Sequence, residues 1–261
     1  MSAGVVGSAE ASVTAVVAAL PEEVAPLRSL LTGIERAWVG PLLVESGRIG
    51  GRRVALSATG DGAGNARVGV AALLAASRAE GLVVIGVAGA LSAGLPTAAL
   101  VVASRVIDGE GRSFVGDPQR VEAVARATGG LSAIVMSSDR LADSVAEKRR
   151  LRDRAQAGEG AAVVDLESAT YVAAAVEAGI PWLVLRAVSD TAEEGLPDLL
   201  NRSRDEGGAV RRGQVFLRLL RQPRAVPFLI ALRGRVGRCA ERLANAAVAA
   251  LPVFCAPGGG R

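Results

Sequence analysis

The sequence contains no histidine among its 261 residues, and this absence excludes several common catalytic arrangements. Ser-His-Asp triads and Cys-His nucleophiles both need an imidazole, and the commonest zinc sites use histidine ligands. Acid-base chemistry in this chain must therefore rely on carboxylates. We expect no metal site.

Cysteine is scarce as well. Cys239 and Cys255 show no Cys-x-x-Cys spacing, which favours free thiols in a reducing cytoplasm over a disulfide.

The first apolar run, residues 13–20, is much shorter than the roughly 20 residues that a membrane span requires, and no positively charged region precedes it. We expect a cytoplasmic protein.

Aromatic residues make up only 3% of the chain, whereas the small and aliphatic residues Ala, Val, Leu and Gly are abundant. Largely apolar runs at 13–20, 82–87 and 182–188 are typical of strands buried on both faces, and alanine-rich helical segments separate them. The sequence predicts a three-layer α/β fold, in which helices flank a twisted mixed β-sheet.

Residues 59–66, Thr-Gly-Asp-Gly-Ala-Gly-Asn-Ala, close one predicted strand and open a helix. Free backbone amides at a helix N-terminus attract anions, so Gly62, Gly64 and Asn65 are candidate phosphate contacts. Glycine-rich turns also join strands to helices without any ligand. The pattern alone leaves both interpretations open.

Two carboxylates follow predicted strands: Glu167 comes after residues 161–164, and Asp190 after residues 182–188. The carboxyl ends of strands in open α/β sheets border the crevice in which ligands bind. An acid at the start of a helix equally serves as a cap or stabilises the helix dipole. Spacing alone does not choose between catalysis and capping. The segment at 142–157, which precedes the strand at 161–164, predicts a highly charged helix with a solvated outer face.

A more specific signal lies in Val-Val-Asp-Leu-Glu-Ser-Ala at 163–169 and Leu-Arg-Ala-Val-Ser-Asp at 185–190. Together they resemble the paired signature of the nucleoside phosphorylase and methylthioadenosine/adenosylhomocysteine nucleosidase superfamily. Further matching segments are Ala-Leu-Pro-Glu-Glu-Val at 19–24, Gly-Ala-Gly at 62–64 and Gly-Val-Ala-Gly-Ala-Leu at 86–91. The resemblance thus extends over residues 13–200 and implies a nucleoside phosphorylase-like fold.

Within that superfamily the chain is most similar to the hopanoid-associated phosphorylases, through Ser-Asp-Arg-Leu-Ala at 138–142, Ala-Glu-Lys at 146–148 and Arg-Gln-Pro-Arg at 221–224. This resemblance implies phosphorolytic release of adenine from adenosylhopane, a glycosyl transfer in hopanoid biosynthesis. Phosphate is then the co-substrate, and no other cofactor is expected. The alternatives are a hydrolytic methylthioadenosine/adenosylhomocysteine nucleosidase and a catalytically silent nucleoside-binding protein.

The resemblance also implies roles for individual residues. A purine leaves as an anion unless it is protonated, and Asp190, oriented by Ser189, is expected to give that proton to N7. The Glu167 carboxylate accepts hydrogen bonds from the ribose hydroxyls, Leu166 lies against the ribose, and Asp165 supports the site. The other expected substrate-binding residues are Ala88, Gly89 and Leu141.

Hydrolysis and phosphorolysis need different second substrates. Glu23 matches the position that activates water in the hydrolytic nucleosidases. The candidate phosphate contacts are Gly62, Gly64, Asn65 and Arg67. Arg186, within the 185–190 segment, is a further candidate phosphate contact, and both Arg67 and Arg186 are alternatively ion-paired structural residues.

Three positions depart from the superfamily pattern. Val87 stands where Ser or Thr is usual, Ala90 where a second Gly is usual, and Leu141 where nucleosidases often place a base-stacking Phe. A small aliphatic wall still packs against adenine through dispersion and burial of apolar area. These departures weaken the resemblance to a standard nucleosidase more than that to the hopanoid branch.

The predicted organisation is a flexible leader at 1–12, a catalytic domain at 13–200 and a basic helical extension at 201–261. The segment from Arg202 to Arg242 contains eleven arginines but only three acidic residues. Apolar residues recur at helical spacing in 214–220 and 226–251. Such amphipathic helices either lie on an anionic membrane surface, here the inner face, or pack on the core or in an oligomer interface. We expect a homo-oligomer, as is common in the superfamily, and no nucleic-acid partner, because no aromatic platform accompanies the arginines.

Overall fold

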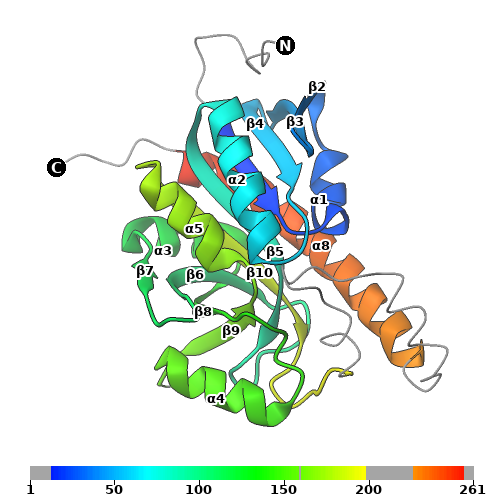
Figure 1. Cartoon of the computed structure of the whole chain (residues 1–261), viewed down its shortest axis with the longest axis vertical. Coiled ribbons are helices and arrows are strands. Elements are labelled where there is room, and N and C mark those ends of the chain that lie inside the picture. The colour runs from blue at the N-terminus through cyan, green and yellow to red at the C-terminus, as the bar shows by residue number, and fades with distance from the viewer. Residues whose placement is uncertain (1–12, 159, 198–225, 256–261) are drawn as a thin grey trace.

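A computed structural model describes residues 13–158, 160–197 and 226–255, and Figure 1 shows a twisted β-sheet with helices on both faces. The predicted three-layer α/β fold is confirmed. The strands are β1 (Val13–Ala18), β2 (Thr32–Val39), β3 (Leu42–Ile49), β4 (Arg52–Ala58), β5 (Ala79–Ala90), β6 (Leu100–Ile107), β7 (Ser113–Val115), β8 (Leu131–Ser137), β9 (Ala161–Asp165) and β10 (Trp182–Asp190). The helices are α1 (Pro21–Arg28), α2 (Ala63–Ser77), α3 (Pro118–Thr128), α4 (Val145–Ala155), α5 (Ser168–Glu177) and α8 (Val226–Phe254).

The strand order explains why several strand ends meet. Among the described residues the sheet runs β10-β6-β8-β9-β5-β1-β4-β3-β2, and β7 pairs with β6. Because β10 also pairs with β5, the strands β5, β10, β6, β8 and β9 close into a ring. β1, β4, β5 and β10 run parallel, so their carboxyl ends lie at the same edge of the sheet.

The central strands are mostly apolar because both of their faces are covered. Successive side chains of a strand point to opposite faces. Ala15 and Val17 of β1 accordingly join the core beneath α2 and α5, whereas Val16 and Ala18 join the core beneath α1, α3 and α8. The absence of a polar face in β1 therefore follows from its central position.

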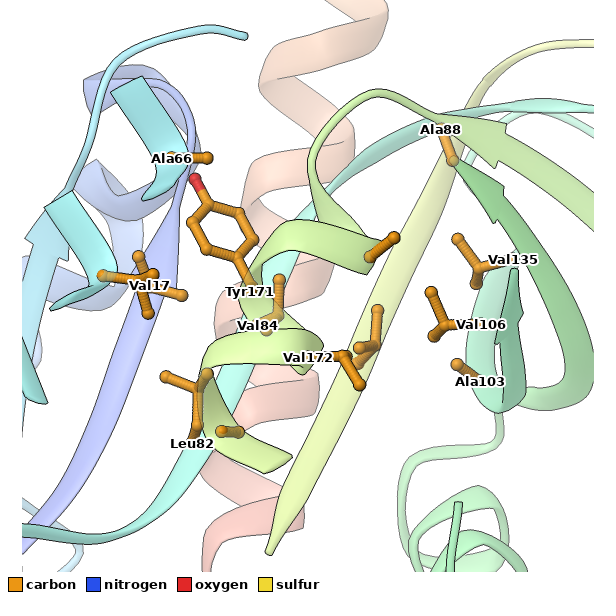
Figure 2. Close-up of a cluster of buried hydrophobic side chains, with 14 of the residues drawn as sticks. Val17, Ala66, Leu82, Val84, Ala88, Ala103, Val106, Val135, Tyr171 and Val172 are labelled. Carbon is orange, nitrogen blue, oxygen red and sulfur yellow. The ribbon is translucent and has the colours of Figure 1, made fainter. Parts of the chain in front are cut away.

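Figure 2 shows part of the first core, in which the ring of Tyr171 from α5 lies near Ala66 of α2 and Val84 of β5. Tyr171 is the only tyrosine in the sequence and is fully buried. Its hydroxyl lies 2.6 Å from Oγ1 of Thr59, so the polar atom is satisfied inside the core. This contact ties α5 to the turn after β4, which borders the site described below.

Helix α8 differs between its two halves. From Cys239 onward it packs into the second core with Leu243, Ala247 and Phe254 fully buried, whereas Ile230 nearer its start is 68% exposed. In Figure 1 the amino-terminal end extends away from the sheet. The second half of the predicted basic extension is thus part of the core. None of the described helices has the length and apolar character needed to cross a membrane.

Two strands were not predicted from the sequence. β2 forms the outer strand of the β2–β3–β4 meander and exposes most of its side chains, and β7 pairs only with the end of β6. The predicted leader at 1–12 and the predicted helix at 214–220 lie outside the described residues.

Candidate active site

A single cavity lies where β1, β5, β9 and β10 end. Nine residues that the sequence singles out line it: Glu23, Ala88, Gly89, Leu141, Asp165, Leu166, Glu167, Ser189 and Asp190. They come from segments far apart in the chain, and the fold alone brings them together. The sequence did not point to four further lining residues, Asp61, Leu196, Leu232 and Val236.

Glu167 lies between the end of β9 and the start of α5. Its Oε1 accepts a hydrogen bond of 2.8 Å from the amide of Gly62, the residue that precedes α2. Burial raises the pKa of Glu167 to about 8, and repulsion from Asp165 adds to the increase. The carboxyl therefore faces the cavity from a site that opposes its ionisation.

Glu23 sits in the first turn of α1 and is buried. Its Oε2 accepts a 2.9 Å hydrogen bond from the amide of Leu20, and its Oε1 accepts one of 2.9 Å from the amide of Val87. Burial raises the pKa of Glu23, although the nearby positive charge of Arg186 opposes the shift. Glu23 thus caps α1, holds the end of β5 and faces the cavity at the same time.

Asp165 is tied into the interior. Its Oδ2 lies 2.5 Å from Nη2 of Arg186, and Ser137 donates a 2.7 Å hydrogen bond to its Oδ1. Arg186 also donates to Oγ of Ser168 and is fully buried. Of the two interpretations of Arg186, phosphate contact or ion pair, the structure shows the ion pair.

The buried Arg186 needs space beneath the site, and Gly86 provides it. A Cβ atom at Gly86 would lie 1.9 Å from Nη1 of Arg186 and 3.0 Å from Oε1 of Glu23. Gly89 does the same for Asp190, because a Cβ there would lie 2.9 Å from Oδ2 of Asp190. Gly86 and Gly89 of β5 are thus explained by buried side chains that pack against the backbone of the strand.

Asp190 ends β10 and is held on both oxygens. Ser189 donates a 2.6 Å hydrogen bond to Oδ1, and Nζ of Lys148 lies 2.5 Å from Oδ2. Lys148 and Asp190 are both nearly inaccessible to solvent. Sequence reasoning missed Lys148, because it stands in a highly charged segment that predicted a solvated helix.

The structure does not bring the other candidate phosphate contacts into this cavity. The amide of Gly62 is used by Glu167, and Gly64, Asn65 and Arg67 are exposed. Asn65 donates its side-chain amide to the carbonyl of Asp61. Arg67 lines a separate depression together with side chains from α5 and the β6–β7 turn.

Four partly exposed aliphatic side chains line the cavity, and we call them its aliphatic mouth. Leu141, before α4, and Leu196, after β10, line it together with Leu232 and Val236 of α8. Arg235 between the last two forms a two-point ion pair with the carboxylate of Glu194, with distances of 2.6 and 2.7 Å. This ion pair anchors the amino-terminal half of α8 beside the cavity.

These features define an α/β enzyme whose carboxylate-lined cavity lies where strands of a mixed sheet end. The chain belongs to the Phosphorylase superfamily, which it matches over residues 13–221.

Relatives and solved structures are similar to the chain over most of its length. The 5′-methylthioadenosine/S-adenosylhomocysteine nucleosidase of Mycobacterium bovis is 28% identical, over 78% of this chain and 95% of the relative. That of Geobacillus kaustophilus is 29% identical, over 69% and 85%. The nucleosidase of Neisseria meningitidis, in complex with methylthio-immucillin-A, superposes with a TM-score of 0.73 at 20% identity, over 92% and 98%. A mutant of the futalosine hydrolase of Helicobacter pylori gives a TM-score of 0.71 at 16% identity, over 92% of this chain and 99% of that chain. These two structures show the shared fold.

Proposed function

We propose that the protein cleaves the N-glycosidic bond of a purine nucleoside. The observation that carries the proposal is the convergence of Glu23, Glu167 and Asp190 on one largely apolar cavity. Asp190 protonates the departing base, because an anionic purine is a poor leaving group. Glu167 accepts hydrogen bonds from the ribose hydroxyls, and its ionised form favours the positive charge that develops on the sugar.

Hydrolysis is the form of the reaction that we propose first. Glu23 borders the cavity and serves as the base that removes a proton from the attacking water. Two observations support hydrolysis over phosphorolysis. The relatives with 28% and 29% identity are named nucleosidases, and Gly64, Asn65 and Arg67 are not among the residues that line the cavity.

Methylthioadenosine is therefore the first substrate to test, with adenosylhomocysteine beside it. We expect the purified protein to release adenine from methylthioadenosine in phosphate-free buffer, and adding phosphate should leave the rate unchanged. Release that depends on phosphate would replace hydrolysis by phosphorolysis. No release from either nucleoside, nor from the lipid nucleoside considered below, would reject the proposed function.

A second candidate is phosphorolytic release of adenine from adenosylhopane. The aliphatic mouth supports it, because Leu141, Leu196, Leu232 and Val236 offer an apolar surface to a large apolar 5′ substituent. Contact of α8 with the inner membrane surface would deliver such a substrate. Phosphate-dependent release of adenine from adenosylhopane in vesicles, without release from methylthioadenosine, would favour this candidate.

A nucleoside-binding protein without activity is the remaining alternative, and Asp190→Asn distinguishes it from an enzyme. If Asp190 is the acid, the variant loses adenine release by about 10²- to 10⁴-fold. Its affinity for adenine, measured by calorimetry, should change far less. A homo-oligomer also stays a prediction, which sedimentation of the purified chain tests.

A further inference from the structure

Lys148 is unusual within this sequence because it is the only lysine. Of the 30 basic residues, 29 are arginine. Arg28, Arg112, Arg126 and Arg235 all form ion pairs that are at least partly exposed. The single lysine occupies a buried position in α4, where it is 1% exposed.

The ammonium of Lys148 has three hydrogen-bond partners. Nζ donates to Oδ2 of Asp190 at 2.5 Å, to the carbonyl oxygen of Thr191 at 2.5 Å and to that of Glu194 at 2.9 Å. Three donors thus meet three acceptors, and one of them is the carboxylate that faces the cavity. The carbonyl of Thr191 and that of Glu194 hold the ammonium whether or not Asp190 is charged.

The other charged and titratable groups near this pair come from α8 and the chain after β10. Arg235 donates to the backbone oxygen of Ser189 and is neutralised by Glu194. The thiol of Cys239 donates to the carbonyl of Val188. Since Arg235 cannot give up its proton and is already paired, Lys148 is the nearest group able to supply a proton to Asp190.

The pairing creates a chemical requirement. A carboxylate that is ion-paired with an ammonium carries no proton, yet the proposed acid must protonate the base as the glycosidic bond breaks. We propose that Lys148 is a positioning residue that holds Asp190 and passes a proton to it as Asp190 protonates the departing purine. This inference rests on the proposed cleavage reaction.

The step balances. The bond between the sugar C1′ and the purine N9 breaks, its electron pair moves to the base, and N7 takes a proton from Asp190. Asp190 receives a proton as one N–H bond of Lys148 breaks and a new O–H bond forms on the carboxylate. The protonation state of Asp190 is therefore the same after the transfer to N7 as before it. Lys148 becomes a neutral amine that keeps two N–H donors for the carbonyls of Thr191 and Glu194. Solvent returns its proton after release, when Glu23 gives up the proton it took from water.

Lysine and arginine differ in one respect that this step uses. Both carry a positive charge, but only the ammonium releases a proton in a protein interior. An ion pair needed for stability alone would accept either residue if the side chain fits. We therefore expect Lys148→Arg and the native chain to differ in kcat and in its pH dependence, even when both are folded.

The kinetic test compares Lys148→Met, Lys148→Arg and the exposed neighbour Arg149→Met with methylthioadenosine as substrate. We expect kcat of both Lys148 variants to fall about 100-fold with little change in KM, because Asp190 must then take its proton from solvent. Their kcat should decline about tenfold per pH unit over a range in which native kcat is level. Arg149→Met should match the native protein.

A native pH profile in folded Lys148→Arg or Lys148→Met would overturn the inference. Absence of adenine release from the native protein would reject the proposed function instead, so the two failures are distinct. Because there is one lysine, ¹⁵N-lysine labelling gives a single side-chain signal in the native chain without any substitution. We expect an ammonium in the free protein, and a neutral amine would overturn the inference because no proton would be available.

Discussion

The three proposed catalytic carboxylates of the cavity are held in different ways. Glu167 accepts a hydrogen bond from one amide at the α2 N-terminus, and Glu23 accepts hydrogen bonds from two backbone amides. Asp190 accepts hydrogen bonds from a hydroxyl and an ammonium. The same residue type in one cavity therefore meets three electrostatic environments. This variety allows one carboxylate to bind the sugar, one to act on water and one to transfer a proton.

The proposed roles of Glu167 and Asp190 come from the sequence motif, whereas the hydrogen-bond partners of these acids could not be predicted from it. The segments at 163–169 and 185–190 identify Glu167 and Asp190 because both lie within short local patterns. Lys148 is 42 residues from Asp190 in the chain. No local pattern encodes that contact, since it depends on how α4 packs beside the end of β10.

Glu167 makes the stability of the fold depend on pH. Its pKa is about 8 in the folded protein, against 4.5 for an ordinary glutamate. Between these values the folded state binds more protons than the unfolded state, so the free energy of unfolding falls as pH rises. We expect Glu167→Gln to reduce this slope, by on the order of a few kcal/mol over the whole range. Urea unfolding at several pH values measures the slope.

A smaller slope should persist in Glu167→Gln, because the pKa of Glu23 is raised by burial and acts in the same direction. Glu177→Gln is the matched control, since Glu177 is an exposed carboxyl at the end of α5. Its slope should equal that of the native chain. Equal slopes for the native chain and Glu167→Gln would contradict the burial of an ionisable group at this position.

Gly86→Ala should destabilise the fold. The added Cβ would lie 1.9 Å from Nη1 of the fully buried Arg186, which cannot move without disturbing its ion pair with Asp165. We expect a loss of about 1 to 3 kcal/mol, as is usual for overpacking. Chemical denaturation gives the difference directly.

Gly237→Ala provides the control for that substitution. Gly237 lies inside α8, and nothing lies within 4 Å of a Cβ placed there. Alanine should therefore stabilise the helix by about 0.5 to 1 kcal/mol. If Gly86→Ala were also neutral or stabilising, the tight passage of Arg186 past β5 would be incorrect.

At the scale of whole elements, burial decides what the sequence reveals. β1, β5 and β10 are covered on both faces, and their largely apolar runs predicted them. β2 exposes most of its side chains and carries no alternation of apolar and polar residues. It is a strand because it pairs with β3, a tertiary cause that its own residues do not show.

Helix α8 offers a test of its two halves. Leu243 is fully buried in the second core, and Ile230 is 68% exposed on the same helix. Leu243→Ala should cost about 2 to 5 kcal/mol through lost contacts and a cavity. Ile230→Ala should stay within about 0.5 kcal/mol of the native protein. Thermal and urea unfolding of the two variants check this difference.

Equal effects of the two substitutions would contradict the packing of α8 on the core. The alternation of arginine with apolar residues at 226–251 predicted the amphipathic helix but not its partner. A stripe that faces a membrane and one that faces a core have the same period. Only the fold shows that the stripe from Cys239 onward meets α1, α3 and the sheet.

For the molecule as a whole, the closed ring of strands determines where a site can form. β10 pairs with β5 on one side and with β6 on the other, so Asp190 lies beside Gly89. β9 pairs with the end of β5 and brings Asp165 and Glu167 to the same place. A sheet of strands could be expected from the sequence, but this closure could not, because β-pairing partners are non-local.

The proposed contact with an anionic membrane leads to a prediction for the intact protein. Arg233 and Arg238 are exposed on the half of α8 that extends away from the sheet, and the neighbouring Leu232 and Val236 border the cavity. We expect the protein to sediment with vesicles that contain phosphatidylserine, and less so at high salt. Each arginine contributes about 1 kcal/mol near such a surface, and the introduced glutamates are repelled by it, so Arg233→Glu/Arg238→Glu should bind at least about 30-fold more weakly.

The control reverses two exposed charges elsewhere, Arg67→Glu on α2 and Arg149→Glu on α4. α2 covers the opposite face of the sheet from α8, so this variant should keep native vesicle binding if α8 makes the contact. Equal weakening in both double variants would mean that net charge, rather than α8, attracts the protein to the vesicle. Native vesicle binding in Arg233→Glu/Arg238→Glu would reject the proposed contact between α8 and the membrane. It would also reject delivery of a lipid-linked nucleoside through the aliphatic mouth. The proposed hydrolysis of a small nucleoside would be unaffected.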